Sequence, residues 1–381
     1  ISRYTLNSPL FVDTVRIFAL VLFMDTITKI TMSTFRAVEL LEYEVFVNRI
    51  LRPALRLSLV VLTLSLGYSF INTMAALLVA SVVLLVVAVW LFVSRLDVRP
   101  QIRSPAATKS RVKSYYNFTA PLVVQNSASI LRSRIDILMV GYFLSSTVVG
   151  VYNVAILVST LLLLPISGIN RLFPPIASRL YSNDETERLS NIYAILTRWV
   201  FTVTLFLALG TIAYRTEILR IFGEEFTAGA LVLSLFVVGQ LLNASAGPVG
   251  LLLMMTDHQY VILINQWAFG ILNIVLNYVL ILEVGIIGAA LASAFTLGAL
   301  NMVRVIEVWY LEGFFPYTLN FLKPLFALVP AAAVMYVLRG VVTGLPGVFV
   351  GGAIGVLAYA LALFVFGVDE KDKELASQYL S

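Results

Sequence analysis

Long apolar runs are the feature that most constrains this chain. Eleven stretches of roughly 20 residues are apolar enough to cross the ~30 Å hydrocarbon core of a bilayer as helices. Only 12% of the 381 residues are charged, which is about half the share in a soluble domain. We therefore expect an all-α polytopic membrane protein, with spans at about 9–31, 47–66, 71–93, 114–142, 149–170, 191–214, 228–255, 260–282, 285–307, 320–339 and 346–367.

Lys and Arg gather on one side of this topology. If successive spans alternate in direction, one side of the membrane receives 19 of the 26 basic residues and the other receives four, the remainder lying within spans. The positive-inside rule makes the side with 19 charges cytoplasmic, together with the C-terminus. We therefore expect a multi-pass protein of the cytoplasmic (plasma) membrane. Its first helix would run from outside to inside, so an odd number of spans, or an uncleaved start, would precede it.

Charged residues interrupt the apolar stretch 118–144. A charge at mid-bilayer costs about 2.5–3.5 kcal/mol on insertion scales, so it usually faces protein or an aqueous cavity. At 100° per residue, Gln125, Ser129, Arg132 and Asp136 fall on one narrow arc of a helix. We interpret this stripe as the lining of a substrate pathway, in which Arg132 binds a phosphate group. Asp136 would position Arg132 or carry a coupling proton; alternatively, the two form an i,i+4 ion pair that only joins helices.

The first span carries two further pairs of charges. Asp13 and Arg16 are separated by three residues, and Asp25 and Lys29 by four. Each pair could couple transport to an ion, or could be an interfacial ion pair. The ion pair is the favoured interpretation for Asp25 and Lys29, because the Lys29 side chain can reach the headgroups.

Amides within the spans are a third group of candidates. Gln240 and Asn243 precede the helix-breaking segment Ala246-Gly247-Pro248, so we expect them to line a cavity and bind neutral polar groups of the substrate. For any single amide, hydrogen bonding between helices is the commoner role.

Two segments resemble each other at an offset near 215 residues. Tyr43 and Asn48 enclose four residues at the start of one span, as Tyr260 and Asn265 do in another, and Gly67 and Gly285 follow about twenty residues later. Chance similarity between apolar helices is as good an explanation, but a parallel duplication would predict that about 100 residues, or three helices, precede the chain.

The spans and the basic segment between them predict a domain plan. We expect residues 1–93 to be the C-terminal half of a first lobe, 94–113 a basic cytoplasmic linker, 114–310 a six-helix second lobe, 311–367 two extra helices and 368–381 a charged cytoplasmic tail.

Short motifs in a fixed order connect this plan to a known family. They are Ala120-Pro121-Leu122, Arg134-Ile135-Asp136, Gly141-Tyr142-Phe143-Leu144, Gly150-Val151-Tyr152, Phe173-Pro174-Pro175, Ile221-Phe222-Gly223, Ala246-Gly247-Pro248 and Asn273-Ile274-Val275-Leu276-Asn277. In their order and spacing, the chain resembles the polysaccharide-biosynthesis (Wzx-type) lipid-linked oligosaccharide flippases. These belong to the superfamily of the multidrug and toxin extrusion (MATE-like) exporters and the murein-precursor flippases.

The resemblance implies a two-lobed helical-bundle flippase fold of fourteen helices, with a central cavity between the lobes. The eleven spans plus three preceding ones agree with that number. Arg134 matches the family's Arg-x-Asp pattern better than Arg132, although it lies about 160–200° from Arg132 and Asp136 around the helix. Both arginines therefore remain candidates for phosphate binding.

We expect a flippase that moves a polyprenyl- or dolichyl-phosphate-linked oligosaccharide across the membrane by alternating access of its two lobes. Its partners would be this substrate, membrane lipids, H⁺ or Na⁺, and glycosyltransferases of the same pathway, and nucleic acid is not expected. The alternatives are an ion-coupled multidrug-type exporter and, less favoured because the loops are short, a membrane glycosyltransferase or polymerase. The chain has no Cys and one His, which argues against a metal site, and we expect neither a cofactor nor an enzyme.

Overall fold

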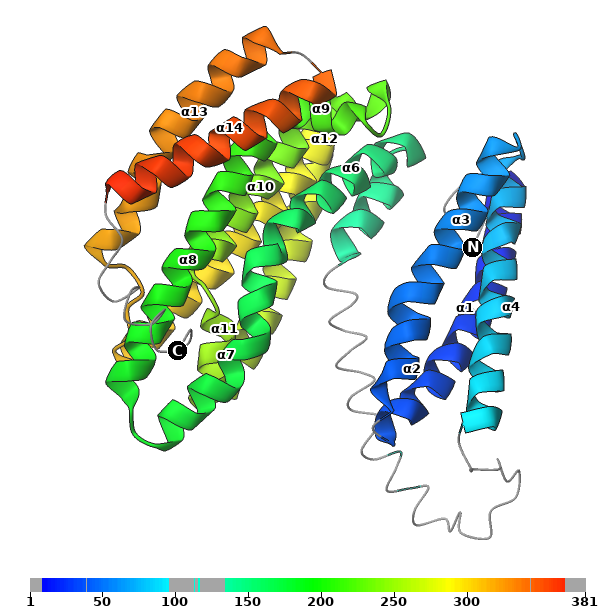
Figure 1. The fold of residues 1–381 in the computed structure, drawn as a ribbon, viewed down its shortest axis with the longest axis horizontal. Coiled ribbons are helices and arrows are strands. Elements are labelled where there is room, and N and C mark those ends of the chain that lie inside the picture. The colour runs from blue at the N-terminus through cyan, green and yellow to red at the C-terminus, as the bar shows by residue number, and fades with distance from the viewer. Residues whose placement is uncertain are drawn as a thin grey trace. The chain divides into compact units, whose positions relative to one another are not determined.

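A computed structural model describes residues 9–38, 40–95, 113, 116, 134–342 and 344–366. All regular secondary structure in these ranges is helical. The chain divides into two compact units, unit 1 over residues 1–120 and unit 2 over residues 121–381. Each unit is a bundle of long helices (Figure 1). The expectation of an all-α architecture is confirmed.

Unit 1 contains α1 (Pro9–Ala37), α2 (Leu41–Val45), the π-helix η1 (Phe46–Leu51), α3 (Arg52–Ser65) and α4 (Phe70–Arg95). Helix α4 packs against both α1 and α3. The core of the unit joins Met32 and Phe35 of α1, Val47 of η1, and Leu84 and Ala88 of α4, all of which are fully buried. Helix α4 therefore holds the other two long helices of unit 1 together.

The π-helix has a local cause. Pro53 occupies the first turn of α3, directly after η1. Proline has no N–H to donate and its ring clashes with the carbonyl four residues earlier, so an undistorted α-helix cannot run through it. The widened turn of η1 lets α2, η1 and α3 follow one another as a nearly continuous helix.

The described part of unit 2 begins with the helical residues 134–143 and continues through nine α-helices and short 3₁₀ segments. They are α6 (Ser146–Ser159), η2 (Thr160–Leu163), α7 (Leu164–Ser182), α8 (Thr186–Ala213), α9 (Arg215–Arg220), η3 (Glu224–Gly229), α10 (Ala230–Ser245), α11 (Val249–Met255), α12 (Gln259–Glu312), η4 (Leu319–Leu322), α13 (Lys323–Val341) and α14 (Gly344–Val365). Helix α10 packs against α6, α8 and α12, so it lies at the centre of the unit. Helices α13 and α14 pair with each other beside α8.

Helix α12 is two helices joined by a sharp reversal. Its 54 residues would be about 80 Å long if straight, far more than one bilayer crossing. The backbone leaves the helical region at Val284 and Gly285, and Gly285 has a φ of +61°. After the reversal Gly288 lies against the backbone of Leu280 with no room for a side chain. The two halves correspond to the predicted spans 260–282 and 285–307.

Seven stretches among the described residues are long and apolar enough to cross a membrane. They are Phe70–Arg95, Ser146–Ser182, Thr186–Ala213, Glu224–Met255, Gln259–Glu312, Leu319–Val341 and Gly344–Val365. The predicted spans 9–31 and 47–66 are also helical, but α1 carries several charges, and α3 alone has 14 residues and reaches only about 21 Å. Most of the predicted span 114–142 lies outside the described residues. The protein is a multi-pass membrane protein.

Candidate functional site

Asp136 is a half-buried carboxylate that lies among the helices of unit 2. Its Oδ2 accepts hydrogen bonds from the Tyr152 hydroxyl of α6 at 3.1 Å and from the Ser293 hydroxyl of α12 at 3.3 Å. Its Oδ1 accepts a hydrogen bond from the backbone N–H of Ile137 at 2.8 Å. Tyr152 is fully buried beside Phe236 of α10. Asp136 is thus a carboxylate held by two hydroxyl groups and one backbone N–H, which makes it a candidate site residue of this unit.

The rest of the predicted polar stripe has a different outcome. Gln125, Ser129 and Arg132 lie outside the described residues, so their relation to Asp136 stays a prediction. Arg134 is described and is exposed, whereas Asp136 is half-buried. This difference follows from the angle of about 200° between positions 134 and 136 on a helix. Within the described residues, two hydroxyl groups of unit 2 donate to the Asp136 carboxylate.

Gln240 and Asn243 belong to a polar chain that ends at a buried arginine. Asn243 donates to Gln240 Oε1 at 3.5 Å, and its own Oδ1 accepts from Asn301 Nδ2 of α12 at 3.0 Å. Arg304 Nη1 then donates to Asn301 Oδ1 at 3.5 Å. Asn301 and Arg304 are almost completely buried. The two predicted amides therefore connect α10 to α12 as well as being cavity candidates.

A break in the helix follows these amides, as Ala246-Gly247-Pro248 predicted. Gly247 has a φ of +62° and lies directly against Thr197 of α8, which leaves no space for a side chain. The Tyr193 hydroxyl of α8 donates to the carbonyl of Ala246 at 3.0 Å. This hydrogen bond satisfies one of the carbonyls that the end of α10 frees, so α8 holds the break in place.

The charges of α1 are paired differently from the prediction. Asp25 Oδ2 lies 2.6 Å from Arg56 Nη2 and 4.0 Å from Arg52 Nη1, both on α3, and forms no ion pair with Lys29. The expected Asp25–Lys29 ion pair is therefore wrong. The physical reason is burial: the Asp25 side chain is only 15% exposed and faces α3, whereas Lys29 is exposed and can keep its ammonium solvated.

Asp13 and Arg16 do form the predicted i,i+3 contact. Arg16 Nη1 lies 3.4 Å from Asp13 Oδ1, and the two side chains are 75% and 54% exposed. An ion pair with this exposure contributes little to stability, and its role in ion coupling stays a prediction.

Sequence reasoning missed several residues of these sites. Arg304 lies within the predicted span 285–307 and was not a candidate, although its spacing of three from Asn301 places the two on one helix face. Tyr152, Ser293 and Arg56 have no local signal, because each acts on a residue distant in the chain. Among the described residues, no group of three or more His, Asp or Glu could hold a metal ion.

Comparison with known proteins identifies a family that matches this chain. The family described as polysaccharide biosynthesis protein matches residues 1–230. Two proteins of Haloferax volcanii are similar to the chain. The probable low-salt glycan biosynthesis flippase Agl15 is 25% identical over 273 residues, covering 70% of this chain and 56% of that protein. The probable flippase AglR is 29% identical over 280 residues, covering 67% of this chain and 53% of that protein.

A solved structure shares the fold. The lipid II flippase MurJ, in an inward closed conformation, aligns with a TM-score of 0.62 and 17% sequence identity over 83% of this chain and 66% of that chain. This likeness extends the helical-bundle flippase fold to the present chain. The chain spans just over half the length of the two curated relatives.

Proposed function

Because the chain belongs to the polysaccharide biosynthesis protein family, we propose that it moves lipid-linked oligosaccharides across a membrane. The substrate would be a polyprenyl- or dolichyl-phosphate-linked oligosaccharide used to build a polysaccharide or glycoconjugate. Both curated relatives are named flippases, which supports transport and not glycosyl transfer. The fold shared with a lipid II flippase supports the same conclusion.

The observation that carries this proposal is the carboxylate of Asp136 inside a transmembrane bundle. An ionisable residue at such a position usually serves a substrate or ion pathway, because its burial is otherwise costly. Asp136 has one carboxylate oxygen shared by two hydroxyl groups from α6 and α12. Uptake of H⁺ or Na⁺ by this carboxylate would weaken its hold on those hydroxyl groups. We propose that Asp136 couples ion uptake to a change in the packing of α6 against α12.

Arginine is the second element of the proposal. The exposed Arg134, and Arg132 with Gln125 and Ser129, would meet the negatively charged phosphate linkage of the substrate. A guanidinium group suits this task because it presents several donors in a fixed plane. Gln240 and Asn243 would supply hydrogen bonds for the glycan. The charge distribution supports a cytoplasmic C-terminus and a location in the cytoplasmic membrane. Glycosyltransferases of the same pathway would supply the substrate.

The proposal is tested in cells that lack the gene. Loss of the gene should cause lipid-linked sugar to accumulate on the cytoplasmic leaflet, and the wild-type gene should restore translocation. Asp136→Asn keeps the shape of the side chain but removes its charge, so it should abolish ion-coupled rescue. Arg134→Ala should reduce rescue strongly and Arg134→Lys should restore part of it.

The control is Arg179→Gln, which changes an exposed arginine of α7. It should rescue fully at equal membrane levels of protein. If polymer length changed while translocation stayed normal in the gene-deletion cells, the flippase proposal would be wrong. Full rescue by Asp136→Asn and Arg134→Ala together would remove these two residues from the mechanism.

A further inference from the structure

Unit 1 contains two polar stripes that face each other. On α1, Asp25, Lys29 and Ser33 recur every four residues and so share one helix face. On the rod formed by α2, η1 and α3, Glu44, Asn48, Arg52 and Arg56 recur at the same interval. The ion pair between Asp25 and Arg56 fixes the two stripes opposite each other at one end.

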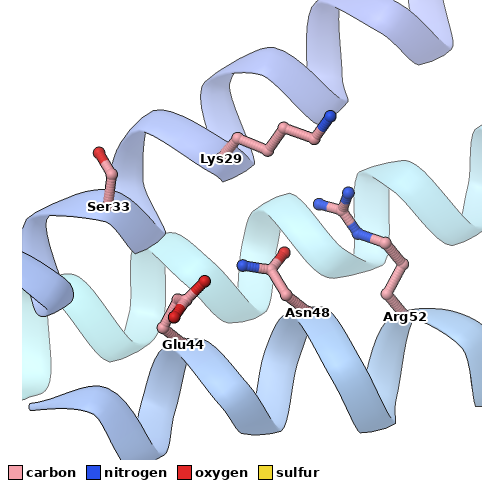
Figure 2. A pocket seen from close by; sticks show the side chains of 5 residues that line it. All are labelled: Lys29, Ser33, Glu44, Asn48 and Arg52. Carbon is pink, nitrogen blue, oxygen red and sulfur yellow. The ribbon is translucent and has the colours of Figure 1, made fainter. Parts of the chain in front are cut away.

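A cavity of about 370 Å³ lies between the stripes. It is lined by Lys29, Ser33, Glu44, Asn48 and Arg52, and Figure 2 shows the side chains of Glu44, Asn48 and Arg52 extending from their helix toward α1. This volume is at the lower end of the range for small-ligand sites in proteins. The cavity is large enough for one small charged group together with water.

Polar atoms beside this cavity lack protein partners. Arg52 Nε and Nη2 and Asn48 Oδ1 are buried, and within the described part of the chain none of them forms a hydrogen bond. Arg52 is only 14% exposed, and its remaining nitrogen is at the limit of an ion pair with Asp25. Buried donors of a guanidinium group are costly to leave unsatisfied, so the site is suited to an acceptor that is not part of the bundle.

The charges around the cavity specify the sign of that acceptor. Asp25 is neutralised by Arg56 at 2.6 Å, which leaves Lys29 and Arg52 facing Glu44. The lining side chains Lys29, Arg52 and Glu44 together carry one net positive charge, which favours an anion such as a phosphate group. The guanidinium of Arg52 offers Nε and Nη2 as adjacent donors, the geometry in which arginine binds two phosphate oxygens.

The surroundings indicate that the phosphate belongs to a lipid. Ile30 of α1 and Phe46 and Ile50 of η1 adjoin lining residues in sequence and are 63%, 48% and 56% exposed. Exposed apolar side chains of this size are available for contact with lipid tails. The π-helix at this position adds a structural signal, because such turns are frequent at functional sites.

We propose that the cavity between α1 and η1–α3 binds the phosphate of a membrane lipid headgroup, held by Arg52 and Lys29. Arg52 donates two hydrogen bonds to phosphate oxygens, and Lys29 contributes a mobile charge at the mouth. Asn48 contacts the esterified part of the headgroup. The residues of this site belong to unit 1, and the proposal does not depend on the proposed transport function. The phosphate could come from a phospholipid or from a polyprenyl phosphate.

The test measures lipid binding to the purified full chain in detergent, by native mass spectrometry. The probes are phosphatidylglycerol, phosphatidylethanolamine, a polyprenyl monophosphate and diacylglycerol, which lacks a phosphate. We expect phosphate-bearing lipids to be retained and diacylglycerol to be lost. Arg52→Gln should weaken retention on the order of tenfold, and Lys29→Gln should have a smaller effect.

Two further variants keep the test decisive. Arg52→Lys keeps the charge but loses the two-donor geometry, so it should bind with an affinity between wild type and Arg52→Gln. Arg179→Gln in unit 2 should bind as wild type does. Retention of the two phospholipids, of the polyprenyl monophosphate, or of all three supports the proposal and identifies the source of the phosphate. The proposal fails if diacylglycerol is retained equally well, or if Arg52→Lys and Lys29→Gln bind phosphate lipids as strongly as wild type.

Discussion

The two units differ in how the buried polar groups between their helices are hydrogen-bonded. In unit 2, Asp136 is held by Tyr152 and Ser293, and Asn301 connects Asn243 to Arg304. In unit 1, the unpartnered buried atoms of the described side chains belong to four neighbouring residues, Asp25, Asn48, Arg52 and Arg56. Those of unit 2 are spread over α8, α9 and α12, on Thr204, Glu217, Gln266, Asn277 and Arg304.

The proposed internal repeat makes this comparison direct. Asn48 and Asn265 would occupy matching positions if the predicted repeat is real. Asn265 is buried and donates to Glu307 Oε2 at 2.6 Å, whereas Asn48 faces the cavity of unit 1 with its oxygen unpaired. The same residue type therefore stabilises the packing of α12 in one unit and lines an open site in the other. Polar residues that satisfy each other stabilise a bundle, and those that do not are available to a ligand.

The largest expected effect follows from breaking the ion pair between Asp25 of α1 and Arg56 of α3. Arg56→Met leaves Asp25 with Arg52 alone, at 4.0 Å, and should destabilise unit 1 by about 3–5 kcal/mol, as for other half-broken buried pairs. Trp90 is the one tryptophan of unit 1, so its fluorescence reports this unit during denaturation when Trp199, Trp267 and Trp309 are replaced by Phe.

Lys29→Met in the same background is the matched control. Within the described residues Lys29 has no ion pair, so its replacement should change stability by less than about 0.5 kcal/mol. Equal losses for Arg56→Met and Lys29→Met would mean that the pairing seen in the structure is not the stabilising one.

The next largest effect concerns Asp136 and the two hydroxyl groups that donate hydrogen bonds to it in unit 2. Asp136→Ala leaves the hydroxyl groups of Tyr152 and Ser293 without their acceptor, and should cost about 2–4 kcal/mol in the stability of unit 2. Thermal unfolding followed by the fluorescence of Trp199, Trp267 and Trp309 measures the loss. Adding Tyr152→Phe to Asp136→Ala should recover part of it, because one unsatisfied hydroxyl group is then removed. An additive loss in the double variant would contradict this account.

Replacing Asn265 should lower the stability of the protein, whereas replacing Asn48 should weaken lipid binding. Asn265→Ala removes a donor to Glu307 and should cost about 1.5–3 kcal/mol, the usual value for a hydrogen bond to a charged group. Asn48→Ala should leave stability almost unchanged but weaken retention of phosphate lipids. Denaturation and native mass spectrometry on the two variants separate these outcomes. Similar stability losses in both would show that the two units use the asparagine alike.

The smallest expected loss of stability concerns a feature that both units share, a glycine with a positive φ. Gly67 and Gly285 have φ values of +72° and +61°, and no atom lies within 4 Å of where their Cβ atoms would be. Gly67→Ala and Gly285→Ala should therefore each cost about 1–2 kcal/mol, from backbone strain alone. Gly288→Ala should cost more, because its side chain would collide with the backbone of Leu280. Thermal midpoints of the three variants give the order.

Much of the fold could be predicted from the sequence. The apolar runs located the helices to within a few residues, for example 71–93 against Phe70–Arg95 and 346–367 against Gly344–Val365. The turn at Gly285 and the break at Gly247 were also indicated, since both need a left-handed backbone that favours glycine. Of the candidate site, the sequence identified Asp136, Gln240 and Asn243 as polar residues of interest. It did not identify their partners, and it assigned Asp25 to Lys29 in place of Arg56.

The sequence by itself determined that this protein is a helical membrane protein, because long apolar segments can satisfy their backbone groups in a bilayer only as helices. It also determined the residue types available for a site, and their order matched a flippase family. Only the tertiary structure decided which of those residues meet. The partners of Asp25 and Asp136 are 31 and 157 residues away, and their contacts depend on how each helix is rotated about its axis and which helices adjoin. Hydropathy fixes the position of a helix in the membrane but not that rotation, so pairing and cavity formation emerge only when the helices pack.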